Sequence, residues 1–199
     1  MSDKEAIEQA IKIASTRDGM LKKVVDELSG SSRRARQNSA AVVAGVAKKN
    51  PSKVVPYVDQ IVDALNRPEA QTRWECMNAL TEIVALESRV CDKAIPGAET
   101  ALFDEDSGPA HLAAMRFLCK LGSTTENRSE KTWPLIDEAI QCYHGDIEFQ
   151  EMLVAVIGFS EGKLAPAVKE ELKARMEFDS KNGKGALKHR AQQIIDNLS

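Results

Sequence analysis

Apolar residues recur along the chain at the spacing of one helical face, and this face recurs about every 38 residues. Five anchor positions mark the recurrence, separated by 37, 38, 39 and 38 residues: Arg36, Arg73, His111, Gln150 and Lys188. The third, sixth, seventh and tenth residues after each anchor are apolar, with Ser39 and Ser160 as exceptions. Because these offsets fall on one side of an α-helix, the pattern predicts five helices that bury equivalent faces.

We call these twenty positions the apolar columns. They are Ser39, Val42, Val43 and Val46; Cys76, Ala79, Leu80 and Ile83; Ala114, Phe117, Leu118 and Leu121; Leu153, Val156, Ile157 and Ser160; and Ala191, Ile194, Ile195 and Leu198. Two of the four columns are apolar in all five repeats. The repetition therefore predicts one supersecondary unit copied five times.

An apolar stretch before each of these helices predicts a partner helix. The stretches cover residues 20–28, 53–65, 90–103, 133–143 and 164–178, and each ends in Gly, Pro, Asn, Asp or Ser residues that stop one helix and cap the next. Prolines at 56, 96, 134 and 166 fall near helix starts, where a missing N–H costs little. We expect Trp133-Pro134 to open its helix, and Pro96 to begin or kink its own.

The first residues predict one further helix. Ser2-Asp3-Lys4-Glu5 fits a capping box, and apolar residues follow at helical spacing. A helix over 2–16 would cover the apolar surface of the first pair. The fold class predicted is all-α, an α-α superhelix (solenoid) of about five helix pairs with an N-terminal capping helix. We expect a single domain over 1–199, with repeats at about 18–50, 51–88, 89–125, 130–162 and 163–199.

Composition agrees with a helical protein and narrows its setting. Of 199 residues, 43% are apolar, and only 11 are Gly and 7 Pro, fewer than a turn-rich β fold needs. No stretch has the length and apolarity of a membrane span, and the acidic start predicts no secretory signal. We expect free cysteines, with Cys76 and Cys119 buried, in a reducing cytoplasm, and no contact with membranes.

The residues around the second anchor carry a family resemblance. A 38-residue pair of helices, with Pro in the first and a short polar turn followed by Arg and then Ala and Leu at helical spacing, resembles the HEAT repeat. Residues 73–80 match best, followed by 36–46. The resemblance covers essentially the whole chain. It implies stacked helix pairs in a curved rod whose concave surface binds proteins, and less often nucleic acid. The arginine of the family pattern is replaced at the last three anchors, so the resemblance does not assign the chain to a subfamily.

The chain shows no arrangement typical of catalysis or metal binding. The histidines, at 111, 144 and 189, are predicted on separate elements, and no Cys or His pair has zinc-site spacing. No phosphate-binding glycine loop occurs. The acidic run 104–106 lacks the pattern of a calcium loop and is expected to cap the following helix. We therefore expect no enzyme activity, no cofactor and no metal.

Charge is distributed unevenly although the net charge is only −3. Residues 1–60 carry a charge of +4, residues 61–162 carry −10, and residues 163–199 carry +3. Much of the first excess comes from Arg33-Arg34-Ala35-Arg36 and Lys48-Lys49, at the two ends of one predicted helix. These cations are either solvated or form a site for an acidic peptide, a phosphate or a nucleic-acid backbone. The acidic middle disfavours nucleic acid along the full length.

The function that these observations favour is a non-enzymatic protein-interaction module or scaffold that uses the surface of the second helices. The partner is an unknown protein, for which an acidic segment is one candidate. We predict the contact residues to be Arg33, Arg34, Arg36, Arg73 and Trp74. The alternative role for Trp74 is to cover the seam between two repeats with its ring. Trp133, at the start of a first helix, is expected to pack inside the fold.

Two alternatives remain. One is nucleic-acid binding, or a relation to the HEAT-like DNA glycosylases that act on alkylated bases with Trp side chains and a carboxylate. The other is a stabilising subunit, or a homo-oligomer that pairs a basic end with an acidic middle.

Overall fold

The computed structural model describes residues 3–17, 19–105 and 107–199, and the regular elements in those ranges are all helical. The chain forms two compact units, Met1–Ala114 (unit 1) and Met115–Ser199 (unit 2), whose boundary falls inside helix α7 (Gly108–Gly122). Each unit is considered by itself. Within the described ranges no helix has the length and apolarity needed to span a membrane.

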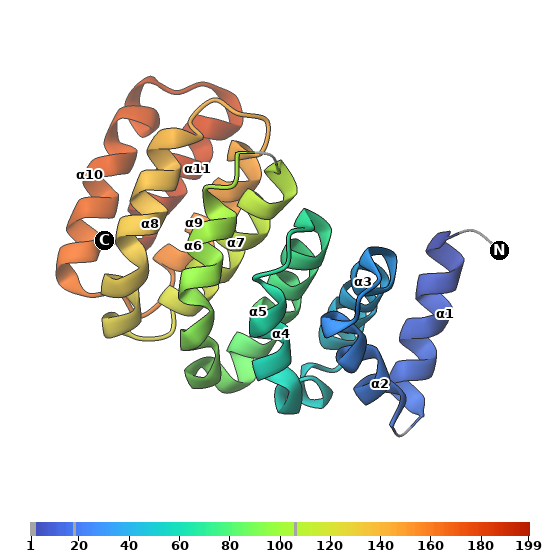
Figure 1. The fold of residues 1–199 in the computed structure, drawn as a ribbon. Helices are drawn as coiled ribbons and strands as arrows, with labels where there is room; N and C mark the ends of the chain where they lie inside the picture. The colour runs from blue at the N-terminus through green and yellow to red at the C-terminus, as the bar shows by residue number, and fades with distance from the viewer. Residues whose placement is uncertain (1–2, 18, 106) are drawn as a thin grey trace. The chain divides into compact units, whose positions relative to one another are not determined.

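Unit 1 begins with one helix and continues with helix pairs. The opening helix is α1 (Asp3–Thr16), the first helices of the pairs are α2 (Met20–Asp26), α4 (Val58–Ala64) and α6 (Ile95–Leu102), and the second helices are α3 (Arg33–Lys49), α5 (Ala70–Cys91) and the start of α7. Short 3₁₀ turns join them: η1 (Glu27–Ser29), η2 (Pro51–Lys53), η3 (Val55–Tyr57) and η4 (Asp92–Ala94). Helix α3 packs between α1 and α5, while α2 packs on α3 and α4 on α5 (Figure 1).

Unit 2 continues the same alternation. After the end of α7 come α8 (Glu126–Cys142), α9 (Phe149–Ser160), α10 (Pro166–Asn182) and α11 (Gly185–Asn197). The first helices α8 and α10 pack against each other, as do the second helices α9 and α11, and α10 packs along α11 (Figure 1). First helices thus contact first helices, and second helices contact second helices.

The apolar columns form the core of both units, as predicted. Seventeen of the twenty positions are buried, and the other three, Ile157, Ile195 and Leu198, are half-buried. Ser160 is buried because its hydroxyl is satisfied: it donates to the Ile157 carbonyl oxygen at 2.6 Å and accepts from Asn197 Nδ2 at 2.9 Å. The repeat pattern therefore located the core, including its polar exceptions.

The cysteines also lie as expected. Cys76 and Cys119 are buried, and burial raises the pKa of both thiols, so they stay protonated and act as small apolar side chains. Cys91 is buried as well, and Cys142 is exposed.

The start of α8 corrects the sequence prediction. We expected Trp133-Pro134 to open this helix, but it begins at Glu126, and Pro134 lies inside it. The polar residues before Trp133 are helical because their side chains satisfy backbone groups. The Thr125 hydroxyl caps the helix by accepting from the Arg128 N–H at 3.3 Å, and Thr132 Oγ1 donates to the Arg128 carbonyl oxygen at 3.0 Å.

Other boundaries shift by smaller amounts. The stretch 53–65 is α-helical only from Val58, with Pro56 in a 3₁₀ turn, and Pro96 begins α6 rather than kinking it. Helix α10 continues to Asn182, past the predicted end at residue 178. Helix α5 contains a break at Glu87 (φ −145°, ψ 65°), close to the predicted repeat boundary.

Helix α1 packs closely on α3 because a glycine makes room for it. A Cβ atom on Gly45 would lie 2.2 Å from Ile11 Cδ1, so any larger residue would displace the Ile11 side chain from its position on α3. This contact fixes α1 as one wall of the surface described below.

The predicted capping box depends on Ser2, which lies outside the described residues, as does Asp106 of the acidic run.

Candidate functional site

Arg36 joins the turn of its own repeat to the next repeat. Its Nη1 donates to the carbonyl oxygens of Gly30 at 2.8 Å and Ser31 at 3.0 Å. Its Nε donates to Glu69 Oε2 at 3.2 Å, and its Nη2 donates to the other carboxylate oxygen. Only 12% of the Arg36 side chain and 4% of the Glu69 side chain are exposed. The guanidinium holds the pKa of the Glu69 carboxyl below its usual range.

Arg73 repeats this arrangement one repeat later. Its Nη1 donates to the carbonyl oxygens of Arg67 and Pro68, both at 3.1 Å, and its Nη2 pairs with the Asp104 carboxylate. The next anchor, His111, hydrogen-bonds the backbone oxygen of the same Asp104 through Nε2. Arg36 and Arg73 therefore each tie two consecutive turns together and turn their charges inward, whereas His111 bonds within its own turn. A contact of Arg36 or Arg73 with a partner stays a prediction.

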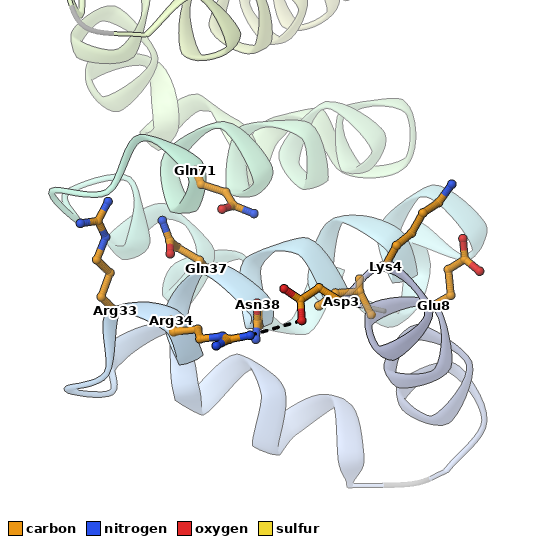
Figure 2. Close-up of a pocket in the computed structure, with 9 residues that line it drawn as sticks. Asp3, Lys4, Glu8, Arg33, Arg34, Gln37, Asn38 and Gln71 are labelled. Atoms are coloured by element: carbon orange, nitrogen blue, oxygen red, sulfur yellow. Dashed lines mark hydrogen bonds and ion pairs between the residues drawn. The ribbon is translucent and has the colours of Figure 1, made fainter. Parts of the chain in front are cut away.

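Arg33 and Arg34 have a different environment, at the rim of a hollow of about 640 Å³. The hollow lies between α1, α3 and the start of α5 (Figure 2). Its lining comprises Asp3, Lys4, Ile7, Glu8, Arg33, Arg34, Gln37, Asn38 and Gln71. Arg34 Nη2 donates to Asp3 Oδ1 at 3.2 Å across the hollow, and Figure 2 shows Gln37 and Asn38 of α3 and Gln71 of α5 among the side chains that line it.

One row of side chains on α5 begins at Gln71, which lines the hollow. Gln71, Trp74, Glu75 and Asn78 follow one another at helical spacing, and all four are partly exposed. Neighbouring residues on the other side of the helix, including Cys76, Met77 and Ala79, are buried. We call Gln37 and Asn38 of α3 together with Gln71, Trp74, Glu75 and Asn78 of α5 the polar face.

Glu75 is the unusual member of the polar face. Burial raises the pKa of its carboxyl, while hydrogen bonds from the Trp74 and Asn78 side chains oppose the rise. The carboxylate is thus partly withdrawn from water between an indole and an amide. Perturbed carboxylates beside aromatic and hydrogen-bonding groups are typical of functional sites.

The remaining candidates in unit 2 have structural roles. Trp133 is 5% exposed, stacks on Phe159 with ring centroids 6.4 Å apart, and donates its Nε1–H to Glu171, which confirms that it packs. His144 Nε2 lies 3.1 Å from both carboxylate oxygens of the buried Asp179. In the part of the chain that the structure describes, no cluster of three His, Cys, Asp or Glu side chains could hold a metal ion.

The structure therefore divides the five predicted contact residues. It brings Arg33 and Arg34 to one hollow and places Trp74 on the polar face, three members of which also line that hollow. Arg36 and Arg73 are instead held in internal ion pairs. Sequence reasoning missed the amides Gln37, Asn38, Gln71 and Asn78, and also Glu75. These residues could have been found as the polar positions between the apolar columns. Most of them lie one or two residues after an anchor, on the side of the helix that faces away from the core.

No protein-family model and no curated protein matches the chain. Several solved structures do. The chain aligns over 98% of its length with 92% of a designed armadillo repeat protein in complex with the peptide (KR)4, at a TM-score of 0.76 and 15% identity. It aligns equally far with 93% of a computationally designed armadillo repeat protein for modular peptide recognition, at a TM-score of 0.73 and 15% identity.

A natural protein also matches. The structure of Kap121p bound to Pho4p aligns with 98% of this chain at a TM-score of 0.69 and 13% identity, and the match covers 21% of that chain. The chain is a helical repeat solenoid. This confirms the predicted all-α fold of HEAT-like, armadillo-like repeats. At these identities the likeness shows the fold alone.

The buried carboxylate of Glu69 should contribute more to stability than an exposed one. Replacing Glu69→Gln removes the charge that pairs with Arg36, and we expect the midpoint of thermal unfolding to fall by about 3–6 °C. The control is Asp59→Asn, which breaks the ion pair between Asp59 and Lys93. Because the Asp59 side chain is 80% exposed, this change should alter the midpoint of thermal unfolding little. Equal effects of the two changes would contradict the structural role assigned to Glu69.

Because the pKa of the Glu75 carboxyl is raised, replacing this residue should increase the stability of the protein by an amount that depends on pH. Above pH 4 the unfolded chain ionises this carboxyl more readily than the folded chain does, so ionised Glu75 opposes folding as the pH rises toward 7. We expect Glu75→Gln to raise the thermal midpoint at pH 7 and to leave it unchanged near pH 4. The exposed Glu82→Gln on the same helix should show no such trend. A Glu75→Gln gain that is the same at both pH values would count against this account.

Proposed function

We propose that the chain is a non-enzymatic interaction module that binds an extended peptide segment of a protein partner on the polar face of α3 and α5. The observation that carries this proposal is the half-buried carboxylate of Glu75, held between Trp74 and Asn78 on that face. The four amides beside it each offer N–H donors and a carbonyl acceptor, which is the combination that a peptide backbone needs. The face thus suits main-chain recognition together with one specific side chain.

The side chain that suits Glu75 is cationic. Glu75 already carries the cost of partial burial, and among the described residues it forms no ion pair. A Lys or Arg of a bound segment would supply the missing charge and lie against the indole of Trp74, where a cation–π contact adds about 0.5–2 kcal/mol. One of the similar structures is a designed armadillo repeat protein in complex with the peptide (KR)4, and this supports a basic segment.

Nucleic-acid binding is the weaker candidate. The pairing of Trp74 with a carboxylate provides the two side-chain types that a base-excision site would use, which is the observation in its favour. Against it, Arg36 and Arg73 are engaged internally, and Glu75 would repel phosphates. A titration with duplex DNA at low salt decides between the two: no binding eliminates this candidate, and steeply salt-dependent binding supports it over a peptide.

The proposal predicts that a basic peptide binds through Trp74 and Glu75 specifically. We expect a fluorescein-labelled Gly-Ser peptide with a central Lys-Arg pair to bind, and Trp74→Ala and Glu75→Gln each to weaken binding by about 3- to 30-fold. Fluorescence anisotropy at physiological salt measures both effects. Circular dichroism confirms that each variant is folded.

The matched control is Glu82→Gln, which removes the same charge from an exposed position of the same helix. General attraction of a cation to an acidic protein would make Glu75→Gln and Glu82→Gln equivalent. Equal losses in the two variants, or full affinity in Trp74→Ala, would refute the proposed site.

A further inference from the structure

We infer that the hollow beside the polar face binds a carboxylate, so that the recognised segment carries an acidic residue at a fixed distance from its cationic one. This inference rests on the proposed function and specifies its partner further. The carboxylate is that of an Asp or Glu side chain of the same peptide. The two sites together would select a segment in which opposite charges are spaced to match α3 and α5.

The first observation is that the hollow already accommodates a carboxylate. Asp3 of α1 extends across to Arg34 of α3, and the Asp3 Oδ1 and Arg34 Nη2 atoms lie 3.2 Å apart (Figure 2). Both side chains are largely exposed, 93% for Asp3 and 76% for Arg34, so the pair is not part of the core. Exposed ion pairs are weak and exchange readily. Asp3 therefore shows how a carboxylate reaches Arg34 and can itself be displaced by a ligand.

The second observation is an excess of unpaired cationic charge at the start of α3. Arg33 forms no ion pair with the described residues, although its charge adds to that of Arg36 in lowering the pKa of the Glu69 carboxyl. The first turn of α3 contains Arg33 and Arg34 and no acidic residue. Cations are unfavourable at this end of a helix, because the helix dipole is positive there. A bound carboxylate would relieve this repulsion.

The charges that line the hollow agree with one additional anion. Three cations, Lys4, Arg33 and Arg34, face two carboxylates, Asp3 and Glu8. Gln37, Asn38 and Gln71 add amide N–H donors to its lining (Figure 2). These groups differ from Arg36 and Arg73, whose Nη atoms already donate to carbonyl and carboxylate oxygens inside the fold. The hollow thus offers exposed donors, whereas the anchor guanidinium groups are withdrawn from the surface.

Helix packing sets the spacing of the two charges in the ligand. The axes of packed helices lie about 8–10 Å apart, and an extended chain advances about 3.3–3.6 Å per residue. A segment that crosses from the hollow at α3 to Trp74 on α5 therefore places its acidic residue about two to three residues from its basic one. The direction of the segment decides whether the acidic residue comes first or last.

Three labelled peptides test this inference. One is the Gly-Ser peptide with a central Lys-Arg pair, and the others carry an added Glu three residues before or after that pair. On the unchanged protein, we expect one Glu-containing peptide to bind at least threefold tighter than the basic peptide in fluorescence anisotropy. This affinity ratio is the quantity compared among variants, because it cancels effects common to all three peptides.

Variants of the hollow should move the ratio in opposite directions. Arg34→Gln and Arg33→Gln should reduce it toward one, because they remove the groups that bind the Glu. Asp3→Asn should raise it severalfold, because the internal competitor is gone. Asp63→Asn is the matched control: it removes the same charge from the exposed surface of α4, outside the hollow, and should leave the ratio unchanged.

The outcomes separate the two proposals. If no peptide binds, the proposed function fails and the inference fails with it. If the basic peptide binds but the added Glu gives no gain at either position, only the inference is overturned. It is also overturned if the gain persists in Arg34→Gln and Arg33→Gln, or if Asp63→Asn raises the ratio as much as Asp3→Asn does.

Discussion

The arrangement of unit 1 depends on an arginine that reaches from one repeat to the next. Arg36 bonds the carbonyls of its own turn and the carboxylate of Glu69 at the start of α5, and Arg73 does the same with Asp104. Because Glu69 immediately precedes α5, this contact sets where α5 begins relative to α3. The hollow and the polar face both take side chains from α3 and α5, so the spacing of these side chains follows from this contact.

Unit 2 uses the same one-repeat spacing with other side chains. Arg175 of α10 donates to both Asp137 oxygens of α8, at 2.6 and 3.0 Å, and the Ser129 hydroxyl accepts from the Ala165 N–H at 3.0 Å. Partners in these contacts are separated by 38 and 36 residues. The period that was visible in the apolar columns therefore recurs in polar contacts. These polar contacts specify which helix packs on which, while burial of the columns supplies most of the stability.

The sequence was sufficient for the core and insufficient for the surface, for a physical reason. Column positions such as Val43 and Leu80 are buried because their period matches a helix, and periodicity needs no knowledge of neighbours. The start of α8 was missed because Thr125 and Thr132 make local hydrogen bonds that composition does not reveal. Arg34 and Arg36 look alike in sequence, yet one lines a hollow and the other is buried against Glu69. That difference depends on a residue 33 positions away.

The two tryptophans allow a direct test of whether the polar face binds a basic segment. In a ¹⁵N-labelled sample each contributes one indole N–H signal: Trp74 from the polar face, and Trp133 from a buried stack on Phe159. On titration with the basic peptide, the account predicts that the Trp74 indole signal and the Asn78 side-chain amide signals shift together, while the Trp133 signal stays in place. A shift of Trp133 without Trp74, or no shift at saturating peptide, would contradict it.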